Sequence, residues 1–328
     1  KKIDIPTNVK LIGQYAFDGC NNLTSIGLPD GLSEIGEGAF SGCRSLQNIN
    51  IPQNVKKIGK KAFNGCTSLK QITVPNGITT IEDFLFSGCL GVESIQIPDN
   101  IEKIGDYAFS GCRSLKDINI PNSTKEIGLL AFYDCSSLTS VTIPQSVTTI
   151  NDSAFRNCVN LKEISIPNNV QKIGSGVFSL CTSLSAFKEK YASADNRSLI
   201  VNDTLVAIAP QGITSYTVPE GVKVLGNFSI WTYNESTGVK NSITHITLPE
   251  SLQVIEKSAF DECATILEFD VLAVAPPVLQ IYSEFLGNTI TNCLTNDSKI
   301  FVPQGSVEAY KKADGWKEYA SLIHPYDF

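Results

Sequence analysis

Cysteine and histidine are the residue types of this chain that could bind a metal, form disulfides or act as nucleophiles. The chain has 10 cysteines but only 2 histidines, His245 and His324. Eight of the cysteines recur at one fixed period, at Cys20, Cys43, Cys66, Cys89, Cys112, Cys135, Cys158 and Cys181. Such a series could form disulfides, a zinc site or a redox thiol, or it could fill one level of a repeated core with a small apolar residue.

The spacing favours the packing interpretation. There is no C-x-x-C pair, and two histidines cannot complete a repeated set of zinc ligands. Cysteines on adjacent strands would lie roughly 5 Å apart, but their parallel side-chain directions are poor geometry for a disulfide. We therefore expect a ladder of buried, reduced thiols. Cys293 belongs to no ladder, and the sequence gives no role for it.

Two further residue types keep the same period as the cysteines. Phenylalanine recurs at Phe17, Phe40, Phe63, Phe86, Phe109, Phe132, Phe155 and Phe178. Proline recurs at Pro6, Pro29, Pro52, Pro75, Pro98, Pro121, Pro144 and Pro167. A fixed repeat of this length means that each unit buries its apolar face only against its neighbours, which is how a solenoid is built.

The elements of one coil can be derived from a single repeat. Ile49 and Ile51 alternate with polar residues, as in a short strand, and Pro52 ends that strand because it cannot donate the next ladder hydrogen bond. A second, shorter extended segment follows. Gly59 is then expected to open a single helical turn that places alanine, phenylalanine and cysteine on one face, and Gly65 is expected to end it in the left-handed conformation.

The residue at the Gly65 position changes along the series. It is glycine in the first five repeats, and Asp134, Asn157 and Leu180 in the next three. Aspartate and asparagine tolerate a positive φ better than other non-glycine residues. Leucine does not, so the sequence predicts distorted geometry in the repeat of Leu180.

The regularity of the repeats divides the chain into four segments. They are eight regular repeats in residues 1–187, a hairpin-like insertion in 188–217, two partly irregular repeats in 218–271 and a capping module in 272–328. The hairpin is indicated by two apolar runs around Asn202-Asp203. A terminal helix over Val307 to Leu322 is expected to cover the open end with Tyr310, Trp316 and Tyr319, because the last coil of a solenoid otherwise exposes its core.

Composition excludes several function classes. The chain has a net charge of −7, and charged residues of both signs occur throughout the repeats. There is therefore no basic stripe for nucleic acid or anionic lipid. The longest apolar run is far below a membrane span. No nucleophile elbow, phosphate loop or metal-ligand cluster occurs. The chain starts in mid-repeat and has no methionine, so we expect it to be a processed or trimmed piece of a longer protein.

The unit L-x-x-I-x-[LIV]-P-x-x-[VIL]-x-x-I-G-x-x-A-F-x-x-C resembles the leucine-rich repeat of the BspA-type surface proteins. The resemblance covers Ile3 to Phe187 and Val218 to Val271, and "IFVPQGSVEAYKKADGW" is similar to the end module of bacterial members. It implies a secreted or lipid-anchored cell-surface protein, with adhesion to host matrix proteins or other cells described for some members. It implies no catalytic residues and no cofactor.

Two surfaces are candidates for partner binding. The outward strand positions form a column of small polar residues, Asn50, Thr73, Gln96, Asn119, Thr142 and Ser165. The irregular region 191–242 adds aromatic residues of the types that anchor interfaces, namely Tyr191, Tyr216, Trp231 and Tyr233. We expect recognition to centre on this insertion, with the strand column as its rim. We expect a monomeric, non-catalytic chain whose partner is a protein or a cell-surface glycan. The main hypothesis is adhesion to host matrix proteins or other cells. The alternatives are a glycan-binding surface protein and a structural spacer of a surface layer.

Overall fold

The computed structural model describes residues 1–231, 233–234, 239–240, 243–260, 266–283, 287–288, 294–295 and 297–326. The chain divides into two compact units, Lys1–Cys181 and Thr182–Phe328, which we call the first and the second unit. Both are stacks of short parallel strands joined by turns, so the solenoid predicted from the repeat is confirmed.

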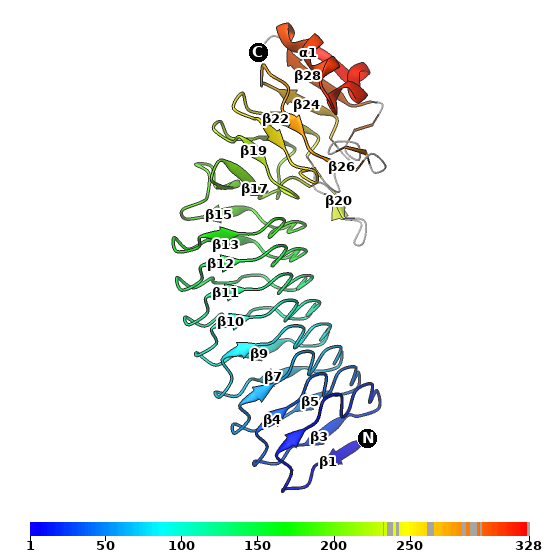
Figure 1. Cartoon of the computed structure of the whole chain (residues 1–328), viewed down its shortest axis with the longest axis vertical. Helices are drawn as coiled ribbons and strands as arrows, with labels where there is room; N and C mark the ends of the chain where they lie inside the picture. Colours follow the sequence, from blue (N-terminus) through cyan, green and yellow to red (C-terminus); the bar gives the residue numbers. More distant parts are fainter. Residues whose placement is uncertain are drawn as a thin grey trace. The chain divides into compact units, whose positions relative to one another are not determined.

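The coils of the first unit contribute to two series of parallel strands (Figure 1). The first series is β1 (Lys2–Asp4), β3 (Ser25–Gly27), β5 (Asn48–Ile49), β7 (Gln71–Thr73), β9 (Ser94–Gln96) and β13 (Glu163–Ser165). The second series is β2 (Leu11–Ile12), β4 (Glu34–Ile35), β6 (Lys57–Ile58), β8 (Thr80–Ile81), β10 (Lys103–Ile104), β11 (Glu126–Ile127), β12 (Thr149–Ile150) and β14 (Lys172–Ile173). Equivalent residues of neighbouring coils pair with each other, as Lys2 does with Ser25.

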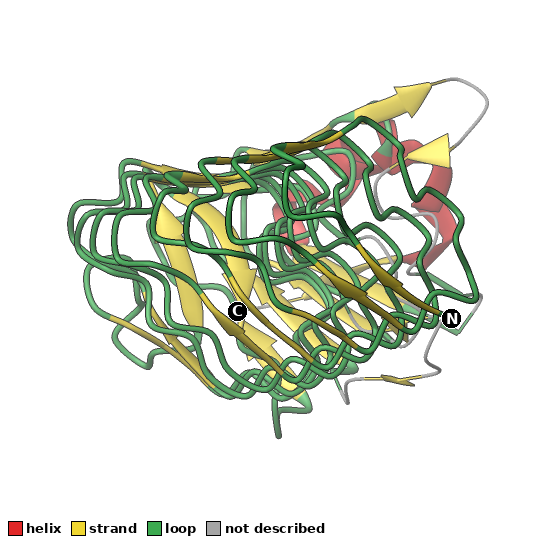
Figure 2. Ribbon diagram, turned by 90° about the horizontal axis from the view of Figure 1, so that it is seen from below, coloured by secondary structure: helices red, strands yellow, loops and turns green. Residues whose placement is uncertain are grey.

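The turn that closes each coil differs from the expected single helical turn. Lys61 takes a φ of 59° and Gly65 a φ of 70°, and the described coils of the first unit contain turns rather than helix (Figure 2). In a helix the amide of Lys61 would point along its own chain. Here it donates to the carbonyl of Asp83 in the next coil at 3.1 Å, and Gly65 donates to Ser87 at 2.7 Å. The left-handed residues thus turn their N–H groups towards the neighbouring coil.

The Gly65 position confirms one prediction and corrects another. Asp134 and Asn157 adopt φ values of 58° and 63°, in the left-handed region as expected. Leu180 also adopts a φ of 64°, so the distortion predicted for its repeat does not occur. The Leu180 side chain is buried. Packing in the core holds the leucine in a conformation that it rarely adopts alone.

Phenylalanine and cysteine ladders form the core of the first unit. The ring centroids of successive phenylalanines from Phe17 to Phe178 lie 5.1 to 5.8 Å apart, with planes within 15° of parallel. The ladder cysteines are free thiols, buried from Cys43 to Cys181 and half-buried at Cys20. Each buried thiol donates to a phenylalanine carbonyl, as Cys66 does to Phe40 at 3.2 Å. Their prediction as packing residues is confirmed; Cys263 and Cys293 lie outside the described residues.

Among its described residues, the second unit has two five-stranded sheets, two short strand pairs and one further strand. The first sheet has the order β16 (Ser198–Val201), β17 (Thr204–Ile208), β19 (Val224–Leu225), β23 (Val254–Ile255) and β25 (Val278–Leu279). The second has the order β18 (Ser215–Thr217), β22 (His245–Leu248), β24 (Glu268–Val271), β28 (Lys299–Pro303) and β29 (Ile323–Tyr326). The remaining strands are β15 (Ala186–Lys188), β20 (Tyr233–Asn234), β21 (Val239–Lys240), β26 (Ile281–Ser283) and β27 (Gly287–Asn288).

The predicted hairpin is present and belongs to the core of the second unit. β16 and β17 are antiparallel, and the turn residues Asn202 and Asp203 have φ values of 50° and 61°. Such a pair of positive φ angles fits the right-handed twist of two strands joined by a two-residue turn. β17 then pairs in parallel with β19, and Leu205 is fully buried. The insertion is therefore continuous with the solenoid sheet.

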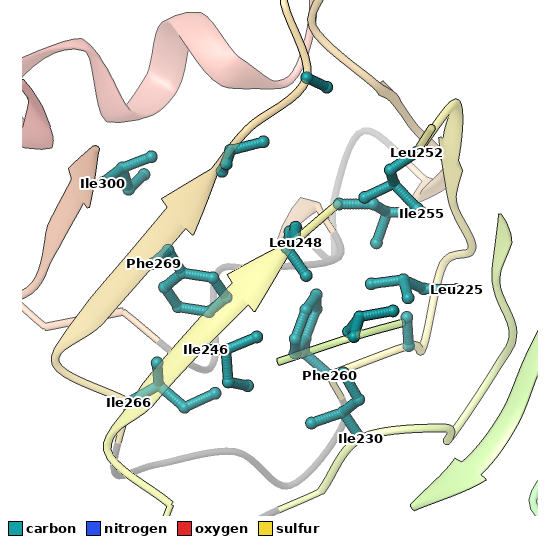
Figure 3. Packing of buried hydrophobic residues seen from close by; sticks show 14 of the residues in the cluster. Leu225, Ile230, Ile246, Leu248, Leu252, Ile255, Phe260, Ile266, Phe269 and Ile300 are labelled. Carbon is teal, nitrogen blue, oxygen red and sulfur yellow. The ribbon is translucent and has the colours of Figure 1, made fainter. Parts of the chain in front are cut away.

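Aromatic residues close the C-terminal end of the second unit. The helix expected over Val307 to Leu322 is split into α1 (Val307–Lys312) and a 3-10 helix (Trp316–Leu322), because Ala313 is extended and Gly315 has a φ of 80°; a short 3-10 turn (Gln304–Ser306) precedes α1. Tyr310, Trp316 and Tyr319 are buried in the same cluster as Phe269, as predicted for a cap. Figure 3 shows Phe260 and Phe269 meeting inside this cluster, with ring centroids 5.3 Å apart.

Candidate binding face

The outward positions of the first strand series form a polar face on the first unit. Asn50, Thr73, Gln96, Asn119 and Thr142 are exposed, and Ser165 is half-buried. The strand geometry causes this, because a strand that buries one isoleucine presents the residues on both sides of it to solvent. β7 buries Ile72 between two exposed residues in this way. The predicted polar column therefore exists as a continuous feature of the surface.

The polar face contains a hollow, which we call the polar hollow. Its volume is about 410 Å³, and its lining side chains are Asn48, Asn50, Gln71, Thr73, Ser94 and Gln96, with the backbone around Ile49, Ile51 and Ile72. The amides and hydroxyls are uncharged donors and acceptors. Thr73 Oγ1 donates to Gln96 Oε1 at 3.0 Å, which orients two of them. The sequence predicted the polar residues but contained no sign of a depression among them.

The hollow lies at a break in the strand ladders. β5 and β7 belong to different sheets, and so do β6 and β8. At the other described coil boundaries of the first unit, the residue after the second strand donates to the previous coil, as Gly59 does to Ile35 at 2.8 Å and Gly105 to Ile81 at 2.7 Å. No such bond joins Glu82 to Ile58 within the residues that the structure describes. In the first strand series, β5 and β7 likewise form no ladder with each other, although Lys70 donates to the Gln47 carbonyl at 3.1 Å just before them.

Two residues of the coil that contains β8 depart from the repeat at this break. Glu82 stands where other coils have glycine, and a Cβ added at the equivalent Gly59 would lie 2.5 Å from the amide nitrogen of Glu37. Leu85 stands where neighbouring coils have alanine, and it is fully buried. The same two coils still join at their turns, where Lys61 donates to Asp83 and Gly65 donates to Ser87. Asn151 also replaces the glycine. Its side-chain amide donates to the Ile127 carbonyl at 3.2 Å, and strand pairing is kept at that coil.

A second depression lies on the other strand series and has a different chemistry. Its volume is about 380 Å³, and its lining includes Glu34, Glu37, Lys57, Lys60 and Glu82. Lys57 pairs with Glu34 at 2.7 Å, and Lys60 pairs with Asp83 at 2.7 Å. These exposed pairs satisfy each other's charge, and such pairs contribute little binding energy of their own. The polar hollow is the better candidate, since its side chains are neutral and β5 and β7 do not pair with each other there.

The aromatic residues predicted to anchor a partner are mostly unsuitable. Trp231 is 1% exposed and Tyr216 is 5% exposed, so both rings belong to the core of the second unit. The Tyr216 hydroxyl is hydrogen-bonded to Ser198, and burial raises its pKa well above the usual range. Tyr191 is half-buried beneath the Lys190 ammonium, which lies 4.7 Å from the ring centroid. The prediction of Trp231 and Tyr216 as contact residues is therefore wrong.

Three further points concern predictions made from the sequence. The side chain of Tyr233, the fourth predicted aromatic anchor, lies outside the described residues. Within the described residues, no group of three or more His, Cys, Asp or Glu side chains could hold a metal ion. In the same part of the chain, no helix is long and apolar enough to cross a membrane.

The comparison with protein families decides the classification. The BspA type leucine-rich repeat region matches in 6 copies, over residues 1–116, 79–191 and 234–295. The chain belongs to this family. BspA-type repeats thus account for the ladders of the first unit and for part of the second, including β22 and β24. No curated protein matches the chain significantly.

Solved structures of bacterial repeat proteins are similar to this BspA-type chain along most of its length. A leucine-rich cell surface protein from Faecalibacterium prausnitzii is 25% identical, with a TM-score of 0.57, over 100% of this chain and 88% of its own. A leucine-rich repeat protein from Bacteroides ovatus is 28% identical, with a TM-score of 0.55, over 92% and 83%. One from Eubacterium ventriosum is 22% identical, with a TM-score of 0.58, over 90% and 83%, and supports the fold alone.

Proposed function

We propose that this chain is a non-catalytic interaction module at the cell surface, which binds a protein partner through the polar hollow. The observation that carries the proposal is the hollow itself, where six uncharged polar side chains surround the edges at which β5 and β7 do not pair with each other. An extended segment of a partner offers peptide N–H and C=O groups that match both. The family supports a protein-interaction role, and the F. prausnitzii relative is named a cell surface protein.

The absence of charge in the hollow favours binding over catalysis. Acid–base or nucleophilic chemistry needs a titratable group close to the reacting atom. The lining residues Asn48, Asn50, Gln71, Thr73, Ser94 and Gln96 supply amides and alcohols instead. Solenoids use extended surfaces of this kind for recognition. We therefore propose host matrix proteins or the surfaces of other cells as partners, held along the polar column on both sides of the hollow.

The test compares two double variants that differ only in their position. Asn50→Ala with Thr73→Ala removes two polar groups from the hollow, and Asn119→Ala with Thr142→Ala removes the same two types from the same column outside it. Binding is measured on a biosensor that carries immobilised collagens, laminin and other matrix proteins. Two lost hydrogen bonds cost about 1–3 kcal/mol, so the hollow variant should bind roughly 5- to 150-fold more weakly.

The matched variant and one aromatic variant decide the alternatives. The Asn119 and Thr142 pair should change affinity by less than about threefold if the hollow is the site. Equal losses in both pairs would make the whole column the site rather than the hollow. Tyr191→Ala should leave binding unchanged, whereas its loss of binding would move recognition to the insertion. Binding to no matrix protein or cell surface would contradict the proposed partner class.

A further inference from the structure

The second unit has an outward strand face whose chemistry differs from that of the polar column. Residues Ile246, Phe269 and Ile300 point into the core, so the alternate residues of β22, β24, β28 and β29 face outward. Register aligns these outward residues in rows across the sheet. One row contains Thr247, Asp270, Phe301 and His324, and the adjacent rows contain His245, Glu268 and Lys299 on one side and Tyr326 on the other.

Asp270, the second residue of this row, is an acidic group that its neighbours hold in place. His245 Nε2 lies 2.7 Å from Asp270 Oδ2, and His245 Nδ1 lies 3.7 Å from Glu268 Oε2. The Asp270 side chain is 16% exposed, so the imidazole holds it in place while part of it stays open to a ligand. A carboxylate fixed in this way offers two oxygens as acceptors for neighbouring hydroxyl groups. Lys299 stands one row away and offers donors on the same face.

Phe301 and His324 of this row form a group of aromatic rings with Tyr326 of the adjacent row. The Phe301 ring lies 5.9 Å from the ring of His324 and 5.7 Å from that of Tyr326, with interplanar angles of 43° and 62°. Tyr326 is 46% exposed, so its ring is open to solvent on this face. The polar column of the first unit has no aromatic residue. The row crosses four neighbouring strands and is therefore about 14 Å long, at roughly 4.8 Å for each step between strands.

We propose that this row binds a neutral saccharide. A sugar ring has an apolar C–H face that suits an aromatic ring, and hydroxyl groups that suit a fixed carboxylate and an imidazole. Phe301 and Tyr326 would supply the first surface, and Asp270 and His324 the second. A row of this length takes more than one sugar unit. This site is independent of the polar hollow, since each lies wholly within its own unit.

Charge favours a neutral ligand over a charged one. Asp270 and Glu268 already face His245, and Lys299 stands beside Glu268 in the register, so the face lacks a concentration of one sign. A basic peptide would therefore gain little from the carboxylates. Nucleic acid would meet a chain of net charge −7. Hydroxyl groups can use both the acceptors and the donors of this face without bringing a charge of their own.

The experiment screens an array of neutral oligosaccharides, with glucans, mannans and galactans among the probes, and measures the affinity of each probe that binds by isothermal titration. Tyr326→Ala and Asp270→Asn should each weaken binding by at least about tenfold, as expected for loss of an anchor. Tyr326→Phe keeps the ring and should bind within about threefold of the unchanged protein. Tyr15→Ala is the matched control, because Tyr15 is 47% exposed in the first unit, and it should have no effect.

Three outcomes would overturn the proposal. The first is that no neutral oligosaccharide on the array binds the unchanged chain. The second is binding that Tyr326→Ala and Asp270→Asn leave intact. The third is that oligolysine binds at this face in a salt-sensitive way while the oligosaccharides do not, since that would identify an acidic site. Circular dichroism of each variant checks that the second unit is still folded, and Tyr326→Phe separates the ring's contact from any effect of truncation.

Discussion

Replacement of Phe109 by alanine tests how far the phenylalanine ladder stabilises the first unit. The Phe109 side chain is fully buried, and its ring centroid lies 5.7 Å from that of Phe86 and 5.2 Å from that of Phe132. Coils on both sides hold the ring in place. After truncation, their backbone hydrogen bonds keep these coils at a fixed spacing, so they cannot collapse into the space that the ring leaves.

The magnitude follows from burial and from the two lost ring contacts. A buried Phe→Ala change costs about 3–5 kcal/mol of unfolding free energy, and a site that cannot collapse lies at the upper end. Each aromatic contact contributes about 0.5–1.5 kcal/mol beyond its buried area. We expect a loss of about 4–5 kcal/mol for Phe109→Ala. Phe17 is half-buried and stacks on Phe40 at 5.3 Å, so Phe17→Ala should cost less than about 2 kcal/mol.

The assay is urea denaturation followed by far-ultraviolet circular dichroism. Trp231 and Trp316 both lie in the second unit, so tryptophan fluorescence would report on that unit. Phe84→Ala is the control, because the Phe84 ring is half-buried and stacks on a single tyrosine at 4.5 Å, and it should cost about 1 kcal/mol. Equal losses for Phe17→Ala and Phe109→Ala, or a loss at Phe109 no larger than the control, would refute the reasoning.

Two further predictions concern the cysteine ladder and the left-handed positions. Native protein should leave the buried ladder thiols unreactive towards a thiol reagent at pH 8, because the thiolate reacts and burial raises the pKa of Cys43 to about 11 and of Cys181 to about 12. Denaturation without reductant should release them, and a shortfall in titrated thiols would mean that some are bridged. Gly111→Ala should cost about 1–2 kcal/mol, because Gly111 has a φ of 74° and an added Cβ would meet nothing closer than 3.6 Å. Gly111→Asn should cost less in the same urea melts, and equal costs would show that space rather than φ sets the requirement.

Much of the first unit could be predicted because its interactions repeat. Phe40 and Cys43 have equivalents in each coil of the first unit: Phe40 stacks on Phe63 of the next coil, and Cys43 donates to the Phe17 carbonyl of the previous one. One correct coil therefore predicts the stack. The helical turn was the error, since the pattern of alanine, phenylalanine and cysteine on one face fits a turn of either kind. Only the direction of the amide hydrogen bonds, which run between coils at Lys61, separates them.

The candidate sites were predicted less well than the fold. The polar column was identified from strand alternation, but the hollow lies where β5 and β7 do not pair, and the repeat gives no sign of that break. Trp231 and Tyr216 were taken as exposed because the regular repeat ends near them. Tyr216 is hydrogen-bonded to Ser198 of the hairpin strand β16, so the folded hairpin contributes to its burial. Sequence spacing in an irregular region does not reveal which ring the sheet will cover.

The sequence by itself determined the coil, its period and the residues of its core, because those depend on contacts between identical positions one repeat apart. The tertiary structure alone decided where the ladder opens and which distant residues meet. His245 and Asp270 are brought together by the pairing of β22 with β24, and Phe301 meets His324 by the pairing of β28 with β29. Both of these pairings join residues 23 positions apart, but the pairing of β24 with β28 brings Asp270 beside Phe301 across 31 positions. Their meeting depends on the register of coils of unequal length, which is fixed only when the sheet forms.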